Sequence, residues 1–518
     1  MNKENRQGLL LRMLLVLLLA CAVTTGAVAQ QQKSEPAQQN EQQEAEKKIT
    51  PEQAKELFAS VDEILQFVSK DTGLPIKHPV KRKLASRGQV EKFIEDRMKG
   101  DQDARRLERS EVVLKKFGLL PEQFDLRTFL VGLLKEQVAG FYDSKKKTIY
   151  LLDWVEPEAQ RAVLAHELTH ALQDQNFDLE KWAKAAEAQP AQKRKDAAPR
   201  FPGKKAAPIF SDKGGAEAEL MEEERLAARQ AVAEGQATVV LIDYMLAPEK
   251  ESVQSNPAIA DAVMAGMMSG GKTPLYIKAP MFLKELLIFP YQYGLKFESD
   301  VLANAGREAA FAGTFQNPPV DTREILQPST YLDKEKLPLM PVPDFEAAGG
   351  KEYTKYDLAV MGEFDVWLLA KQYAGQDAAA AISTSWRGGY YYAALKPGVP
   401  NPSKRDATVP ASSIALAYAS KWANADAAEQ FAAIYAKYLG KRYKQVEGDP
   451  GTAASMKAGA PSGQVAVGIA KGFAGAHDWK TEGGPVSIET RGDTVLVMEG
   501  FDGGTGARIA DAVFGDRK

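Results

Sequence analysis

The chain contains 518 residues, with 44% hydrophobic and 26% charged residues and a formal net charge of -3. This length can bury more than one hydrophobic core, so we expect two domains, or one large domain with additional elements. A small fold that depends on cross-links for its stability is excluded. Because the composition has no basic excess, it argues against a nucleic-acid partner.

The N-terminus has the pattern of a secretory signal peptide over residues 1–29. Basic residues precede a short apolar run at residues 13–20, and the small residues Ala27 and Ala29 offer a cleavage site after position 29. The apolar run is too short to remain as a membrane-spanning helix. We therefore expect an exported protein, either periplasmic or extracellular.

The single cysteine, Cys21, gives this N-terminus a second interpretation. Residues 18–21 read LLAC and resemble the bacterial lipobox, in which cleavage before the cysteine leaves a lipidated N-terminus. Cleavage after Ala29 and lipidation at Cys21 both stay open, and a membrane contact is expected only through such an anchor. In either case the mature protein has no disulfide, so packing, with or without a metal, must stabilise it.

A polar segment separates the signal from the first regular structure. Residues 30–49 are polar and low in complexity, which predicts a disordered linker. A helix is predicted to begin at Thr50-Pro51, an N-cap followed by proline, because apolar residues then recur at helical spacing as far as Val68. Helical elements are expected to continue through residues 107–120.

A β-hairpin is predicted over residues 140–152, where the runs GFY and TIYLL flank a polar turn. A helix should begin at Pro157 directly after it, since no Gly or Pro interrupts residues 158–175. Residues 181–215 are rich in Ala, Lys, Arg and Pro and are predicted to be a mobile insertion. A further helix is expected from about residue 217 to about residue 246.

The helix after the hairpin carries the clearest chemical signal, HELTH at residues 166–170. His166 and His170 are four residues apart, about 40° around a helix axis, so both imidazoles can reach one ion. Glu167 projects beside such an ion, where a carboxylate can take a proton from zinc-bound water and deliver it to a leaving amine. A chance match is expected in only about a few per thousand chains with so few histidines.

A hydrolytic zinc site needs a third protein ligand and leaves one position open for water. The HExxHxxGxxH spacing is absent, because Gln173 and Asn176 occupy the positions that would carry its glycine and third histidine. The remaining histidines, His78 and His477, lie far off in the sequence and carry no motif. The third ligand is therefore expected to be a carboxylate.

Glu234 is the best candidate, because it is a lone acid in an apolar helical segment. A buried carboxylate is too costly unless it is paired or bound to a metal, so an ion pair with Arg229 is the alternative. Small neighbours such as Gly235 should let this helix approach the HELTH helix closely. The run at residues 222–224 is typical of a solvated face, and Asp174 is expected to orient a histidine from outside the metal.

With these residues the sequence resembles the gluzincin branch of zinc metallopeptidases, the thermolysin-like enzymes, in which HExxH lies on one helix and a glutamate follows on another. The resemblance implies Zn²⁺ ligands at His166, His170 and Glu234, and a general base and acid at Glu167. It also implies that a peptide substrate lies along the sheet edge formed by the hairpin ending at Leu152.

The likeness extends beyond the site and also has a limit. The segments GFYDSKKKTIYLLD, HELTHALQDQNFDL, AVAEGQATVV, PPVDTREILQP and SWRGGYYY resemble uncharacterised secreted bacterial proteins predicted to be zinc peptidases, over most of the chain from about residue 70. Thr238 stands where the thermolysin pattern has an aspartate. The oxyanion donor is unassigned: Tyr291, Tyr293 and Arg323 are candidates, although each alone is more often structural.

The sequence thus predicts an α+β, mainly helical fold with a zincin-like catalytic core, a small sheet and an HExxH helix. Residues 50–345 form the catalytic region, and residues 346–518 a mostly helical region with a terminal hairpin, in the same domain or a separate one. The predicted function is an exported zinc-dependent metallopeptidase acting on peptides or proteins. Two alternatives stay open: a non-catalytic envelope binding protein or lipoprotein that retains the scaffold, and a zinc hydrolase of non-peptide amides.

Overall fold

The computed structural model describes residues 48–97, 101–138, 140–186, 220–270, 273–337, 340–401, 409–448 and 473–515. The expected signal peptide, Cys21, nearly all of the expected linker and most of the expected insertion lie outside these ranges. Among the described residues, no helix has both the length and the apolar character needed to cross a membrane.

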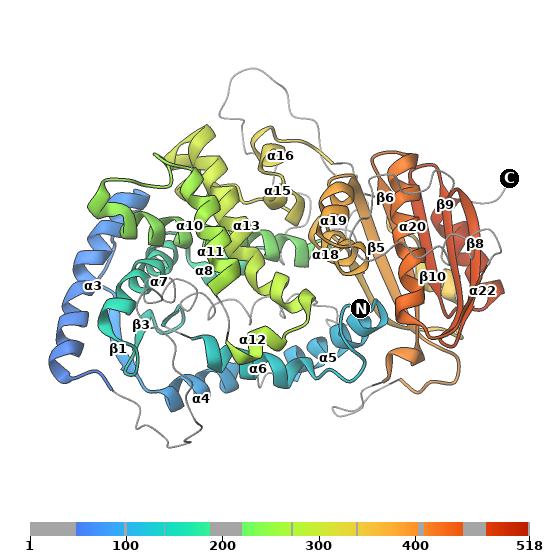
Figure 1. Cartoon of the computed structure of the whole chain (residues 1–518), viewed down its shortest axis with the longest axis horizontal. Coiled ribbons are helices and arrows are strands. Elements are labelled where there is room, and N and C mark those ends of the chain that lie inside the picture. The colour runs from blue at the N-terminus through green and yellow to red at the C-terminus, as the bar shows by residue number, and fades with distance from the viewer. Residues whose placement is uncertain are drawn as a thin grey trace, which may run out of the picture.

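The described chain forms two bodies placed side by side along the long axis, a helical one and one built on a large sheet (Figure 1). Helices outweigh strands, which agrees with the expected α+β, mainly helical class. The helical body contains α3 (Pro51–Thr72), α4 (Arg87–Arg97), α5 (Asp101–Lys116), α6 (Leu126–Gln137), α7 (Pro157–Phe177), α8 (Leu179–Lys184), α10 (Glu222–Leu246), α11 (Ala258–Gly270), α12 (Pro274–Lys278), α13 (Met281–Ala305), α14 (Thr314–Gln316), α15 (Thr322–Leu326) and α16 (Pro328–Leu332).

Two helices begin where the sequence predicts. Thr50 caps α3: its hydroxyl accepts from the Gln53 amide, and the Gln53 side chain accepts in return from the Thr50 amide. This reciprocal pair satisfies two amides that a helix start otherwise leaves without partners. Pro157 occupies the first turn of α7, where its missing N–H costs nothing.

A three-stranded sheet contains the predicted hairpin. Its strands are β1 (Lys81–Ala85), β2 (Phe141–Asp143) and β3 (Thr148–Leu152), in the order β1-β3-β2. Strand β3 pairs antiparallel with β2 and parallel with β1, so it lies in the middle of the sheet. The edge that the hairpin leaves open is therefore β2, not the strand that ends at Leu152.

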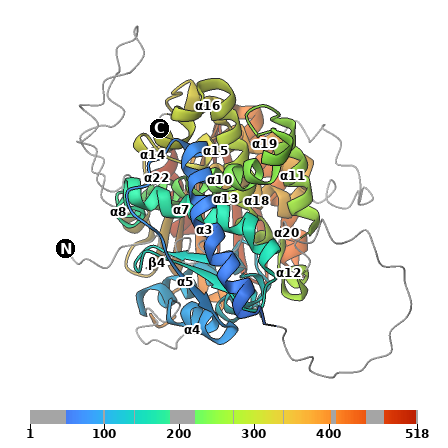
Figure 2. The ribbon, with the colours of Figure 1, turned by 90° about the vertical axis from the view of Figure 1, so that its left-hand side faces the viewer.

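Helix α7 is surrounded by other elements. It packs against both α3 and α10, and Figure 2 shows α3 crossing in front of them. Every residue from Val163 to Asp174 is buried, including those on the side that carries the histidines. The helix thus packs on all sides, and α10 covers the face that carries the histidines.

The start of the expected insertion is ordered. Residues 181–184 belong to α8, so the boundary predicted at residue 181 is too early. Trp182 accounts for this order: its indole N–H donates to the Phe315 carbonyl at 2.8 Å, and its ring lies 4.3 Å from the Phe315 ring. The buried aromatic contact offsets the entropy of ordering this polar segment.

Helices α10 and α13 cross in direct backbone contact. A Cβ built on Gly235 would lie 2.3 Å from the Gly294 carbonyl carbon and oxygen, and one on Gly294 would lie 2.2 Å from the Ala231 oxygen. Gly235 was expected to face the HELTH helix, but it faces α13 instead. Adjacent helical residues differ by about 100° in direction, so once Glu234 faces α7 its neighbour cannot.

Gly235→Ala is expected to destabilise the fold by about 1–3 kcal/mol, because the added methyl group meets rigid backbone. We also expect weaker zinc binding, since Glu234 would move with α10. Urea unfolding and zinc titration measure the two effects. Gly440→Ala in α20 (Ala425–Arg442) is the matched control, as its Cβ would meet nothing within 4 Å. Equal stability of the two variants would contradict this close crossing.

The second body is built on a seven-stranded antiparallel sheet in the order β4-β5-β6-β10-β9-β8-β7. The strands are β4 (Thr354–Val360), β5 (Trp386–Leu395), β6 (Ile414–Trp422), β7 (Val446–Gly448), β8 (Gly475–Thr481), β9 (Gly484–Arg491) and β10 (Thr494–Glu499). The accompanying helices are α17 (Phe345–Gly349), α18 (Glu363–Ala374), α19 (Gln376–Ser383), α20 and α22 (Gly503–Phe514).

This sheet corrects the expectation of a mostly helical region over residues 346–518, although the terminal hairpin is present as β9 and β10. In β6, alternate residues enter two different cores: Ala415 and Ala417 pack with α22, while Leu416 packs on the side of α20. A strand buried on both faces has no alternation of polar and apolar residues, so the sequence pattern hides it.

A buried ion group joins the two bodies. Glu499 of β10 pairs with Arg442 of α20 at 2.7 Å and with Lys116 of α5 at 3.3 Å. Burial opposes ionisation of Glu499, but the two cations outweigh it and hold its pKa at about 2. Moving α5 away from the sheet would leave a buried charge without its partner, which is strongly unfavourable. The ion group therefore holds α5 against the sheet.

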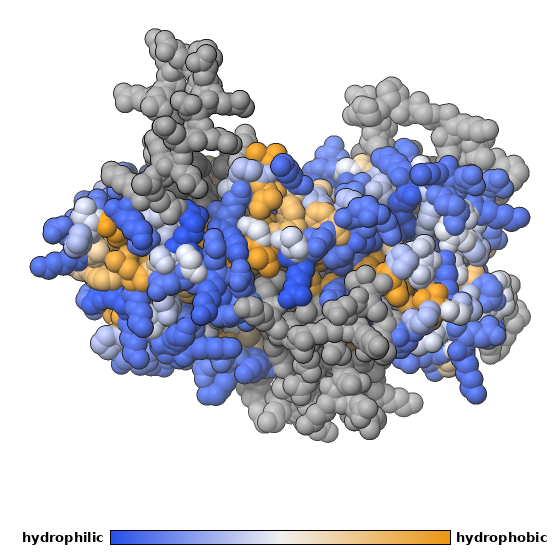
Figure 3. Space-filling model, turned by 90° about the horizontal axis from the view of Figure 1, so that it is seen from below, coloured by the Kyte–Doolittle hydropathy of each residue, from blue (hydrophilic) through white to orange (hydrophobic). Residues whose placement is uncertain are grey.

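Seen from below, the described surface is mainly hydrophilic, with hydrophobic side chains in scattered areas (Figure 3). The exposed large apolar side chains of the described residues are Ile277 and Met245. Scattered apolar side chains of this kind are normal on a protein surface.

Candidate metal centre

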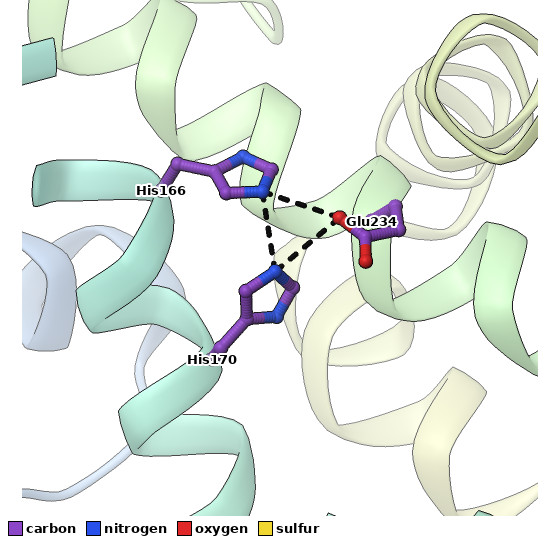
Figure 4. A group of neighbouring side chains, drawn as sticks. All are labelled: His166, His170 and Glu234. Carbon is purple, nitrogen blue, oxygen red and sulfur yellow. Dashed lines mark hydrogen bonds and ion pairs between the residues drawn. The ribbon is translucent and has the colours of Figure 1, made fainter. Parts of the chain in front are cut away.

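Three side chains from α7 and α10 converge on one point (Figure 4). His166 Nε2 lies 3.2 Å from Glu234 Oε2, His170 Nε2 lies 3.3 Å from the same oxygen, and the two nitrogens are 3.1 Å apart. All three side chains are buried. Within the described residues, this is the one group of three or more His, Cys, Asp or Glu side chains able to share an ion.

The spacing of these donor atoms fits a zinc ion. Ligand atoms about 2.0–2.1 Å from a tetrahedral zinc are roughly 3.3 Å apart, close to the separations found here. Two imidazole nitrogens and one carboxylate oxygen are also the donor types of hydrolytic zinc sites. His166, His170 and Glu234, the ligands expected from the sequence, can therefore hold zinc together, with a fourth position left for water.

The same group is electrostatically coupled without a metal. Burial opposes the charge on Glu234, but His170 and His166 outweigh it and lower its pKa to about 2. Burial favours neutral His170, but the Glu234 carboxylate outweighs this and raises the pKa of His170 to about 9. An anionic carboxylate thus faces the two imidazoles, as a cation site requires.

Gln173 orients His170. His170 Nδ1 lies 2.8 Å from Gln173 Oε1, while Gln173 Nε2 donates to the Ala233 carbonyl at 3.0 Å and to Gln236 Oε1 at 3.1 Å. Because the amide nitrogen of Gln173 is committed to these acceptors, its oxygen accepts from His170. His170 therefore carries a proton on Nδ1, and with a metal bound it would offer its Nε2 lone pair as the ligand.

The expectation that Asp174 orients a histidine is wrong. Its carboxylate accepts from the Tyr142 hydroxyl at 2.7 Å and from Lys147 Nζ at 2.6 Å, both in the hairpin. Arg229, the alternative partner of Glu234, donates to the Trp182 carbonyl at 2.6 Å, and its guanidinium lies over the Trp182 ring. Glu234 Oε2 itself lies within 3.3 Å of both histidines.

Glu167 lies beside the group and is held by the hairpin. Its Oε2 accepts from the Tyr142 backbone N–H at 2.8 Å. Burial raises the pKa of Glu167, and the charges of His166 and His170 oppose that rise, so the carboxylate lies within the electrostatic field of the group. A carboxyl group with a raised pKa is suited to accept and return a proton.

A family comparison covers this part of the chain. Residues 121–239 match the IrrE N-terminal-like domain, Peptidase_M78. The match spans the hairpin, the HELTH helix and Glu234, and it takes in less than a quarter of the chain. The matched family supports a zinc peptidase, and its members can also be regulatory. Comparisons with curated proteins and with solved structures found no match.

The three expected oxyanion candidates have different neighbours. The Tyr291 ring centroid is 6.3 Å from that of His166. Tyr293 instead packs in an aromatic cluster with Phe364 and Trp367. Arg323 forms an ion pair with Glu335 at 2.9 Å. Of the three candidates, Tyr291 is the one whose ring lies near a histidine of the candidate site.

The other two histidines take no part in the site. His78 is exposed, and its backbone N–H donates to Gln175 Oε1 at 3.3 Å. His477 lies on β8 in the second body, with its ring 4.4 Å from the Phe473 ring. Both positions agree with the sequence interpretation that neither carries a motif.

Gln173 and Tyr142 were missed by the sequence interpretation. Gln173 stands three residues after His170, on the same side of the helix, and this spacing could have suggested a contact. For Tyr142 the sequence offered no signal, because its two contacts join a strand to helix residues 25 and 32 positions later.

Gln173→Ala is expected to weaken zinc binding by about 10–100-fold, the usual cost of removing the partner that orients a metal-bound histidine. Competition against a chromophoric chelator measures this. Gln175→Ala is the control on the same helix, because Gln175 contacts the backbone of Lys77 and His78 rather than the site. An equal zinc affinity in the two variants would remove Gln173 from this role.

Proposed function

We propose that the protein is an exported zinc-dependent metallopeptidase in which His166, His170 and Glu234 hold Zn²⁺ and Glu167 is the general base. The observation that carries the proposal is the convergence of two Nε2 atoms and one carboxylate oxygen within 3.1–3.3 Å, beside Glu167. That this occurs within the IrrE-like segment supports peptide hydrolysis. The N-terminal signal pattern supports export.

The chemistry divides between the metal and Glu167. When bound, zinc lowers the pKa of a water molecule and polarises the peptide carbonyl. The Glu167 carboxylate takes a proton from the attacking water and passes it to the leaving nitrogen. Tyr142 holds Oε2 of this carboxylate, which leaves Oε1 for the proton transfer. Gln173 accepts from His170 Nδ1, which leaves Nε2 of that ring for the metal.

The arrangement is of gluzincin type with a different support around the ligands. Glu234 lies on a helix that follows the HELTH helix, as in that branch. Thr238, at the position of the thermolysin aspartate, donates its hydroxyl to the Glu234 backbone carbonyl at 2.7 Å and not to a histidine. A neutral amide, Gln173, takes the place of an acidic partner for His170. A neutral partner leaves the imidazole a weaker donor and the zinc a stronger Lewis acid.

The proposal is tested on purified mature protein by elemental analysis together with cleavage profiling of a broad, proteome-derived peptide library. We expect about one zinc per chain and cleavage products that disappear on chelation and return with zinc. Zinc-loaded protein that cleaves no peptide would favour a regulatory or binding role for the same fold. Hydrolysis of amide substrates other than peptides would favour the non-peptide alternative.

Export is tested on the N-terminus of the mature protein. Mass spectrometry of the protein recovered from the envelope and from the medium should find a chain that begins at residue 30, or a lipidated Cys21. Recovery of full-length chain from the cytoplasm alone would contradict export without affecting the zinc site.

A further inference from the structure

We propose that Tyr142 is a positioning residue for Glu167, anchored on α7 by its hydroxyl and holding the base by its backbone amide. The proposal rests on the proposed function, because it concerns the residue that would move the proton. Two hydrogen bonds from the same residue carry it: Tyr142 N–H to Glu167 Oε2 at 2.8 Å, and Tyr142 O–H to Asp174 Oδ2 at 2.7 Å.

The two contacts fix β2 along α7. Glu167 and Asp174 are seven residues apart, which is about two turns and roughly 10 Å along the helix axis. Tyr142 reaches both, one with its backbone and the other with the end of its side chain. A strand held at two points on one helix can neither slide along it nor rotate away, so the amide that faces Glu167 keeps its place.

Asp174 is itself a fixed acceptor. Its side chain is fully buried, and it accepts from Lys147 Nζ at 2.6 Å and from the Leu179 amide at 3.2 Å. Lys147 belongs to the turn of the same hairpin. The ion pair and the hydrogen bond from the Tyr142 hydroxyl therefore both hold the hairpin against α7. Hydrogen bonds to an ionised carboxylate are the stronger kind, which suits an anchor.

The anchor is needed because β2 is weakly held otherwise. It has three residues, lies at the edge of the three-stranded sheet and pairs with β3 alone. Within the described residues, the Tyr142 amide is the hydrogen-bond donor of the Glu167 carboxylate. If β2 shifts, Glu167 loses the contact that sets its direction, and an error of 1 Å in such a group can cost about 100-fold in rate.

Tyr142→Phe tests this by removing only the hydroxyl. On a peptide that the zinc-loaded wild type cleaves, we expect kcat to fall by roughly 10–100-fold, with KM and zinc affinity within about twofold of wild type. Tyr331→Phe is the matched control, because it also loses a hydroxyl bond, to the Asn317 carbonyl at 2.8 Å, away from the site. A kcat for Tyr142→Phe within twofold of that control would overturn the proposal.

A double-variant comparison separates positioning from general damage. If the hydroxyl acts through Asp174, Asp174→Asn should lower kcat, and the double variant should lose little more than the worse single variant. Fully multiplicative losses would mean that the two residues act independently, which contradicts the proposed anchor.

Hydrogen exchange tests the anchor without any turnover. In the zinc-loaded full chain, amides of residues 141–152 should exchange faster in Tyr142→Phe than in wild type, and at the wild-type rate in Tyr331→Phe. This result would support the anchor even if the wild type cleaved no peptide, in which case the proposed function alone would fail. Unchanged exchange with unchanged kcat would overturn the anchor and leave the proposed function standing.

Discussion

Glu234→Ala is expected to remove zinc from the protein at stoichiometric concentrations. Its Oε2 lies within 3.3 Å of both histidine nitrogens and supplies the anionic donor of the group. Loss of a direct ligand should weaken binding by more than the roughly 10–100-fold that an orienting partner costs. Elemental analysis after dialysis, and a chelator competition for the affinity, measure the change.

Asp243→Asn provides the control for a buried carboxylate on the same helix. Asp243 is buried nine residues further along α10, where Asp71 and Arg307 are its neighbours rather than the histidines. Zinc content should match the wild type in this variant. If Glu234→Ala retained one zinc per chain, Glu234 would be excluded as a ligand and the ion pair with the histidines would be purely structural.

Glu167→Gln is expected to abolish measurable peptide hydrolysis while zinc stays bound. Glutamine keeps the size of the side chain and can still accept from the Tyr142 amide, but it cannot take a proton. Loss of a general base costs about 10²–10⁴-fold in rate. Turnover and zinc content are measured on the same preparation, so that a loss of activity is not mistaken for a loss of metal.

Glu158→Gln is the matched control for this change. Glu158 lies in the first turn of α7, exposed and paired with Arg161, so its replacement should leave both rate and zinc content near wild type. If Glu167→Gln kept the wild-type rate, the general-base assignment would fail, although the three ligands would be unaffected.

The local geometry of α7 could be predicted because it depends only on helical periodicity. A spacing of four residues places His166 and His170 on one side of any helix, whatever surrounds it. The start at Pro157 and the preceding hairpin also follow from short-range signals. Glu234 was found in another way, from the cost of a buried acid without an obvious partner.

The contacts around the candidate site could not be predicted from local sequence patterns. Gln173 and Asp174 are adjacent on α7, one turn after His170, and from the sequence either side chain could contact this histidine. Gln173 meets the histidine because α10 lies on its side and offers the Ala233 carbonyl to its amide. Asp174 turns to Tyr142 because the hairpin lies on the other side. Their roles depend on where two distant elements pack.

The sequence alone determined the chemistry: a helix with two histidines and a glutamate, a lone buried acid downstream, and an N-terminus typical of export. Each is encoded within a few residues, through helical spacing, burial cost or a short signal pattern. The tertiary structure alone decided which side of α10 faces α7, which residue orients His170, that β2 holds Glu167, and that a large sheet forms the second body. Those outcomes depend on contacts between residues far apart in the chain, which no local pattern contains.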